Sequence, residues 1–200
     1  MNQPDNYVLQ LFPKICSLYF LKEDLTELNK LKSFEFNEFI PHTYATSSFK
    51  VLDFFPSIQS LIIEKFNHFK NTTLLLNSTD FKISSSWGTK IEPNGRSGAH
   101  NHRNSFYSGI LYWEDFEDVK LELEDFYKSG FFIIPDKWND KNYLHFYLET
   151  LKNNLFFFPS EIYHSVTTNT TSQTRYSLAF NIMPVGTIGR ADSSVTIDIK

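Results

Sequence analysis

Residues 81–91 have the sequence FKISSSWGTKI, in which Phe, Ile, Ser, Trp, Thr and Ile alternate with Lys, Ser, Ser, Gly and Lys. Successive side chains of a strand point to opposite faces, so this period of two predicts a β-strand whose Lys, Ser and Gly positions form the wetter face. Before about Leu74 the apolar spacing is instead close to 3.6 residues, which is typical of helices. We therefore expect the strands to begin near Leu74.

Further short segments downstream also have β-type patterns, and turn-forming stretches such as Pro93-Asn94-Gly95 separate them. These segments are Phe106–Trp113, Val119–Leu123, Phe131–Ile134, Leu144–Glu149, Leu155–Phe158, Arg175–Met183 and Ser194–Ile199. Short strands at this spacing are typical of a β-sandwich or β-barrel.

The first third of the chain has two apolar stripes at helical spacing. They consist of Leu21, Leu25, Leu28 and Leu31, and of Ile58, Leu61, Ile62, Phe66 and Phe69. Pro56 stands just before the second stripe, where proline is favoured as a first helical residue. We expect one domain over residues 1–200, with a mainly helical support region at residues 1–73 packed outside a β core at residues 74–200.

Composition and charge limit the function classes. The chain has 200 residues, of which 41% are hydrophobic, 17% aromatic and 21% charged, and this composition excludes disorder. A net charge of −4 without a basic cluster argues against nucleic acid and anionic membranes as partners. One cysteine, Cys16, allows neither an intrachain disulfide nor a thiolate zinc cluster.

The first apolar stretch, residues 7–12, is short and has no basic leader before it, unlike a secretory signal. No run approaches the 18 apolar residues that a membrane-spanning helix needs. We therefore expect a cytoplasmic protein.

Three of the six histidines suggest a metal site. His100 and His102 are two residues apart, so on an extended chain both side chains project to the same side. His164 follows the apolar run Leu155–Pro159, which has the composition of a buried strand. Three neutral imidazoles bind Fe, Co, Ni, Cu or Zn and leave coordination positions open. The competing interpretation is a polar loop and a surface histidine.

Arg175 shares one face of its predicted strand with Ser177 and Asn181, whereas Leu178 and Phe180 occupy the other. A guanidinium facing the interior of a barrel needs an anion, because an unpaired buried charge is costly. The strand offers no Asp or Glu. Since the planar guanidinium suits bidentate carboxylate binding, we expect the anion to be a ligand.

Residues from about 82 to 200 resemble the iron(II)- and 2-oxoglutarate-dependent oxygenases of double-stranded β-helix (jelly-roll) fold, especially a bacterial and phage group with prolyl-hydroxylase-like features. The matching blocks are Ser86-Trp87, His100-Asn-His102-Arg-Asn-Ser105, Ser108-Gly-Ile-Leu-Tyr112, Phe157-Phe-Pro-Ser160 with His164, and Arg175-Tyr-Ser-Leu-Ala-Phe-Asn181. Their order and spacing are more specific than any one block.

The resemblance implies a dioxygenase in which O2 oxidises a small-molecule or protein side-chain substrate while 2-oxoglutarate is decarboxylated to succinate. It makes His100, His102 and His164 the Fe(II) ligands. Arg175, with Ser177 and Tyr112, would bind the far carboxylate of 2-oxoglutarate. A hydroxylase is the reaction class that the family suggests.

His102 departs from the general family pattern, which has a carboxylate at this position. In the bacterial and phage group a His-x-His pair is the usual form, so three imidazoles are the favoured ligand set. The alternative is His102 with His164 and either Asn104 or water. At the level of function, the alternatives are a non-catalytic ligand-binding or interaction module and a three-His dioxygenase that does not use 2-oxoglutarate.

Acidic residues crowd positions 114–125. They form either a solvated, charged strand edge that discourages aggregation or a lip that recognises a basic substrate. His42, His68 and His145 have no convergent partner in the sequence, and we expect them to be structural.

Overall fold

The computed structural model of the protein describes residues 13–116, 119–124, 134–137, 139, 142 and 144–199. Its larger sheet has eight antiparallel strands in the order β1-β9-β6-β11-β4-β3-β2, and β12 pairs with β11 outside this path. These strands are β1 (Ser17–Phe20), β2 (Phe36–Ile40), β3 (Thr43–Thr46), β4 (Asp80–Ile91), β6 (Tyr107–Leu111), β9 (Asn154–Pro159), β11 (Arg175–Ile188) and β12 (Val195–Ile197).

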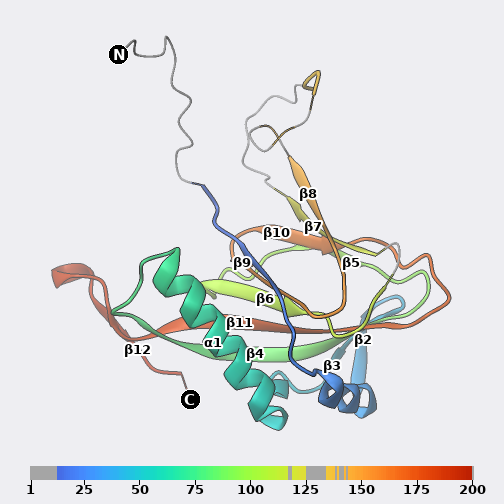
Figure 1. Cartoon of the computed structure of the whole chain (residues 1–200), viewed down its shortest axis with the longest axis horizontal. Helices are drawn as coiled ribbons and strands as arrows, with labels where there is room; N and C mark the ends of the chain where they lie inside the picture. Colours follow the sequence, from blue (N-terminus) through green and yellow to red (C-terminus); the bar gives the residue numbers. More distant parts are fainter. Residues whose placement is uncertain are drawn as a thin grey trace.

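The smaller sheet has four antiparallel strands in the order β5-β10-β7-β8. They are β5 (Ser97–His100), β10 (Tyr163–Val166), β7 (Lys120–Glu124) and β8 (His145–Glu149). Figure 1 shows α1 (Pro56–Thr72) lying across the larger sheet, with the smaller sheet beyond it. Two antiparallel sheets with helices outside form the expected double-stranded β-helix, so the predicted fold class is confirmed.

Each face of the larger sheet has its own apolar core. Between the sheet and the helices lie α1 residues such as Phe66 and strand residues such as Phe157 and Phe180. Between the two sheets lie Tyr112, Phe158 and other residues from both sheets. The second core surrounds the inner face of β11, where the sequence places Arg175.

The predicted second helix is present as α1, with Pro56 at its start and Ile58, Ile62, Phe66 and Phe69 buried. The first stripe differs from the prediction. Only its last two leucines lie in a helix, the 3-10 helix η1 (Thr26–Ser33), although all four leucines are buried. Two more 3-10 helices are η2 (Val51–Phe54) and η3 (Ala191–Ser193). All four leucines pack in the core on the helix side, so burial and not regular helix explains their spacing.

The expected division at Leu74 is wrong for the strands, since three of them come from the first third of the chain. β1 pairs with β9, and the hairpin β2–β3 joins the larger sheet through β4. No clear pattern marks them in the sequence, because β1 has four residues and β2 is exposed at its three central positions. The candidate strand Phe131–Ile134 lies largely outside the described residues.

The Ser and Gly positions of β4 that were expected to be wet are instead buried at Ser86 and Gly88. The hydroxyl of Ser86 accepts a hydrogen bond from the backbone N–H of Leu52, at 2.8 Å. A Cβ at Gly88 would lie 2.5 Å from Leu31. Small side chains therefore let η1 and η2 approach this face. Among the described helices, none has the length and apolarity needed to cross a membrane.

Candidate functional site

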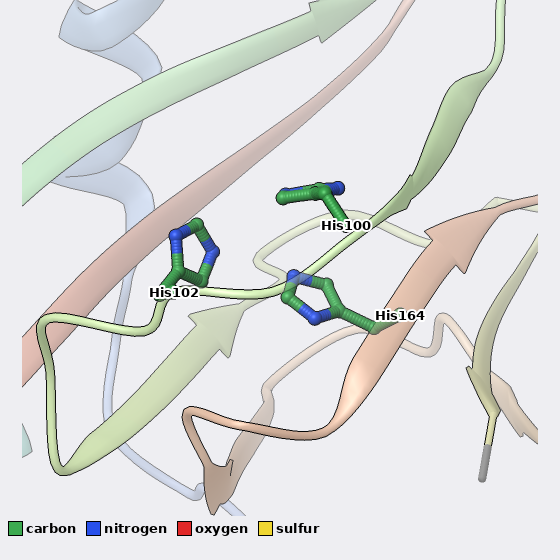
Figure 2. Close-up of side chains that lie close together, drawn as sticks. All are labelled: His100, His102 and His164. Atoms are coloured by element: carbon green, nitrogen blue, oxygen red, sulfur yellow. The ribbon is translucent and has the colours of Figure 1, made fainter. Parts of the chain in front are cut away.

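Figure 2 shows three histidines that lie close together: His100 at the end of β5, His102 in the segment that follows, and His164 on β10. His164 pairs in register with His100 at the end of β5, and His102 lies two residues further along the chain. One ligand nitrogen of each lies within 4.8 Å of the other two. The structure thus brings together all three predicted histidines, which is the arrangement that a single metal ion requires.

Backbone carbonyls fix the orientation of two of these rings. Nδ1 of His100 lies 2.8 Å from the carbonyl oxygen of Gly98, and Nδ1 of His164 lies 3.1 Å from that of Ile162. A carbonyl oxygen only accepts, so each Nδ1 carries the proton and donates it. In the neutral rings each Nε2 then has a free lone pair, as in metal sites whose histidines are oriented by a second partner.

Burial keeps two of the rings neutral. The pKa of His164 is lowered to about 3, mainly by burial and also by the nearby His100 and His102, while the carbonyl of Ile162 opposes the shift. Burial, followed by the proximity of His100, lowers the pKa of His102 to about 4. Both rings are therefore ready to bind a metal at neutral pH, because the ligand form of histidine is unprotonated.

The chain around His102 is held by its backbone. Its N–H donates to the carbonyl of Ser160, at 2.9 Å, and its own carbonyl accepts from the N–H of Ser105, at 3.0 Å. The ring of Trp87 lies 5.4 Å from the imidazole, between ring centroids. Asn104, the alternative ligand, is exposed in the turn that follows. The geometry therefore favours His102 with His100 over the pair His102 and Asn104.

A buried hydrogen-bond network, which sequence reasoning missed, lies behind this segment. The hydroxyl of Ser108 donates to Oδ1 of Asn181, at 2.8 Å, and Ser160 Oγ lies 2.8 Å from Ser108 Oγ. Since the one proton of Ser108 is used, Ser160 donates to Ser108. The amide of Asn181 donates in turn to Ser85, at 3.1 Å. The network joins β4, β6 and β11 to Ser160, whose carbonyl holds the backbone of His102.

Arg175 is 1% exposed, and no nitrogen of its guanidinium has a hydrogen-bond partner among the described residues. Its Cζ lies 4.8 Å from the centroid of the Tyr112 ring, and the Tyr112 hydroxyl is also buried without a hydrogen bond. Burial lowers the pKa of Arg175, but a guanidinium stays charged in proteins. Such a group normally has an anion beside it.

A cavity of about 330 Å³ connects the histidines with Arg175. Its walls include Ser177 and Trp87, and its size lies at the lower end of the usual range for small-molecule sites. Among the described residues that line it, none is acidic. Those residues therefore offer Arg175 no counter-ion, and a carboxylate on a small molecule suits both the charge and the fork of the guanidinium.

The remaining predicted features lie outside this cavity. Glu122, Glu124 and His145 lie close together, and Nδ1 of His145 is 2.7 Å from a carboxylate oxygen of Glu122. Glu122 and Glu124 alternate on β7 with Leu121, which lines the cavity, so this part of the acidic stretch faces away from it. His68 lies 2.9 Å from the Tyr19 hydroxyl, which agrees with a structural role.

Comparisons with known proteins agree with this geometry. Residues 85–181 match the model of a family described as "Putative 2OG-Fe(II) oxygenase". That segment contains the three histidines, Tyr112 and Arg175. No curated protein matches the chain significantly in sequence.

Solved structures with the same fold share little sequence with this chain. HygX from Streptomyces hygroscopicus, with nickel and 2-oxoglutarate bound, is 10% identical, with a TM-score of 0.56 over 80% of this chain and 77% of HygX. A Pseudomonas putida prolyl-4-hydroxylase is 16% identical, with a TM-score of 0.53 over 83% and 91%. The α-ketoglutarate-dependent epimerase SnoN from nogalamycin biosynthesis is 11% identical, with a TM-score of 0.56 over 80% and 69%.

Proposed function

We propose that this chain, a member of the 2OG-Fe(II) oxygenase family, is a dioxygenase. It uses iron(II) and 2-oxoglutarate to hydroxylate a small molecule or a protein side chain. The observation that carries the proposal is the cavity itself. It has three convergent imidazoles and a buried guanidinium that makes no hydrogen bond to the described residues.

In this proposal His100, His102 and His164 hold the iron. Their fit to a divalent metal is supported by the neutral state of the two buried rings and by the carbonyl-oriented Nδ1 atoms of His100 and His164. Three protein ligands leave positions free for other molecules, as in catalytic metal sites in general. HygX, which shares the fold, binds nickel and 2-oxoglutarate.

Arg175 binds the far carboxylate of 2-oxoglutarate. The guanidinium offers two parallel donors, and Ser177 lines the same cavity two residues along the strand. Tyr112 lies against the guanidinium with its hydroxyl unpaired, so a carboxylate reaching Arg175 would also satisfy that donor. The guanidinium of Arg175 and the hydroxyl of Tyr112 then both have a hydrogen-bond acceptor, which removes the free-energy cost of burying a donor without a partner.

When bound, iron(II) and 2-oxoglutarate supply oxidation by O2, with decarboxylation of 2-oxoglutarate to succinate. The protein orients the reactants and excludes water. Trp87 and Phe158 contribute apolar walls beside the metal ligands, since their rings lie 5.4 Å from His102 and 4.8 Å from His164, respectively. Hydroxylation is proposed from the resemblance to prolyl hydroxylases. SnoN, which has the same fold, is described as an epimerase, so the fold also supports another reaction.

The three-imidazole set itself favours a second candidate, a dioxygenase that oxidises its ligand without 2-oxoglutarate. Arg175 favours the first candidate, because a buried guanidinium without a hydrogen-bond partner among the described residues can bind the second carboxylate of a keto acid such as 2-oxoglutarate. The test is to supply the metal-free protein with iron(II), 2-oxoglutarate and O2 and to measure succinate. Succinate above the level of a His164→Ala control is expected. Iron binding without any succinate would favour the second candidate.

A further inference from the structure

Apart from Arg175 and the three histidines, the described residues that line the cavity carry no ionisable side chain. Most of the cavity wall is apolar, with a few small polar residues. The apolar side chains are those of Phe39, Ile40, Trp87, Ile91, Ile110, Leu121, Phe158 and Val166. Apolar walls favour apolar groups, because polar groups lose their hydration without gaining partners there.

Phe39 stands out within this wall. It comes from β2, in the hairpin that the sequence did not predict, and it lines the cavity while 54% exposed. Its ring therefore lies at the edge of the cavity, where it is accessible to a ligand. Trp87, on β4, offers a second aromatic side chain in the same wall.

The charge of the loaded site follows from its ligands. Three neutral imidazoles leave both positive charges of iron(II) in place, whereas a carboxylate ligand would remove one of them. The 2-oxoglutarate dianion offsets two charges, so the charge of Arg175 remains in excess. No acidic residue among those described in the lining compensates it. A cation entering this cavity would therefore be repelled and would also lose its hydration.

We propose that the substrate presents an uncharged, apolar group to the metal, that this group packs against Phe39 and Trp87, and that cationic groups are rejected. The inference rests on the proposed function, because it places iron and 2-oxoglutarate in the cavity. It assigns Phe39 and Trp87 as specificity-determining residues. It also disfavours the basic substrate that the acidic stretch 114–125 suggested, since Glu122 and Glu124 lie on the face of β7 opposite Leu121.

Two probes of the same shape test the charge preference: benzyl alcohol, which is neutral, and benzylammonium. The protein is loaded with Mn(II) and 2-oxoglutarate, and relaxation of the ring protons of each probe is compared with that in the Zn(II)-loaded protein. Paramagnetic relaxation reports binding close to the metal without any turnover. We expect benzyl alcohol to bind at least about tenfold more tightly than benzylammonium. Repulsion between two unit charges a few ångströms apart lowers affinity by a factor of that size.

Substitutions test the assignment of Phe39. Phe39→Ala should weaken benzyl alcohol about tenfold, because it removes an aromatic contact surface. Phe54→Ala is the matched control, since Phe54 is 66% exposed and is not among the lining residues. Phe39→Glu should reverse the preference and make benzylammonium the better ligand. Because Phe39 is largely exposed, these variants should fold normally.

The outcomes separate this inference from the proposed function. Failure of the metal-loaded protein to bind 2-oxoglutarate would overturn the proposed function. Binding of 2-oxoglutarate together with equal affinity for the two probes, no relaxation effect of benzyl alcohol, or no effect of Phe39→Ala would overturn the inference alone.

Discussion

The two faces of β11 have opposite characters. Leu178 and Phe180 point to the helix side, where they are fully buried among aromatic rings such as that of Phe157, 5.9 Å from Phe180. Arg175 points to the other side, into a cavity where it makes no hydrogen bond to the described residues. One face of the strand thus packs in the core and the other faces the cavity, and we expect substitutions on one face to leave the properties of the other nearly unchanged.

The largest expected effect is on the helix side. Phe66 of α1 is fully buried, and its ring lies 5.3 to 5.6 Å from those of Phe81, Tyr107 and Phe157. Phe66→Ala should reduce the free energy of unfolding by about 3–5 kcal/mol, as large cavities in aromatic cores do. Urea denaturation measures this, and the metal affinity of the folded variant should match wild type. A marked loss of metal affinity would show that the two faces are coupled.

On the cavity side, His164→Ala should weaken metal binding by at least about 100-fold. Removing a metal ligand costs more affinity than removing a group that merely orients that ligand. Metal content after dialysis measures the effect. His68→Ala is the matched control, since His68 lies on α1, contacts Tyr19 of β1 and is not a member of the group of three histidines. Retention of the metal by His164→Ala would contradict the three-imidazole site.

The network behind His102 should connect stability with the metal site. Asn181→Ala leaves the hydroxyl groups of Ser108 and Ser85 without their partner and should cost about 1–3 kcal/mol of stability. Because Ser160 also holds the backbone of His102, metal affinity should fall as well. Thermal unfolding and metal titration check the two effects. A stability loss with unchanged metal affinity would show that the network does not position His102.

The smallest effect runs in the opposite direction. Arg175→Met removes a buried charge that lacks a partner, so the ligand-free protein should gain about 1 kcal/mol or more. Denaturation in the absence of 2-oxoglutarate measures the gain. A clear loss of stability would indicate that Arg175 pairs with an anion of the protein itself. Both faces of β11 would then contribute to stability.

The sequence predicted the parts of this fold whose patterns are local. The alternation in β4 and β11 and the stripe of α1 identify their own elements, and the inward face of Arg175 followed from alternation alone. Strand partners are not local, and β1 to β3 gave no clear pattern because they are short or half exposed. For this reason Phe39, which comes from β2, was missed as a cavity residue.

The candidate site shows the same division. The spacing of His100 and His102 indicated their convergence, and the pairing of β5 with β10 explains how the predicted His164 comes to lie beside them. The network of Ser108, Ser160 and Asn181 could not be predicted, because its members are 52 and 73 residues apart and have no distinctive spacing.

The most direct test of the account is to titrate 2-oxoglutarate into the iron(II)-loaded protein without oxygen, following the metal-to-ligand absorption band in wild type, Arg175→Lys and Arg175→Ala. We predict that Arg175→Ala binds 2-oxoglutarate roughly 30- to 1,000-fold more weakly with nearly unchanged iron affinity, because one bidentate charged pair is lost. Arg175→Lys should fall between the two, since it keeps the charge but loses the fork. Equal affinity in all three proteins would contradict the claim that the buried guanidinium is the carboxylate site.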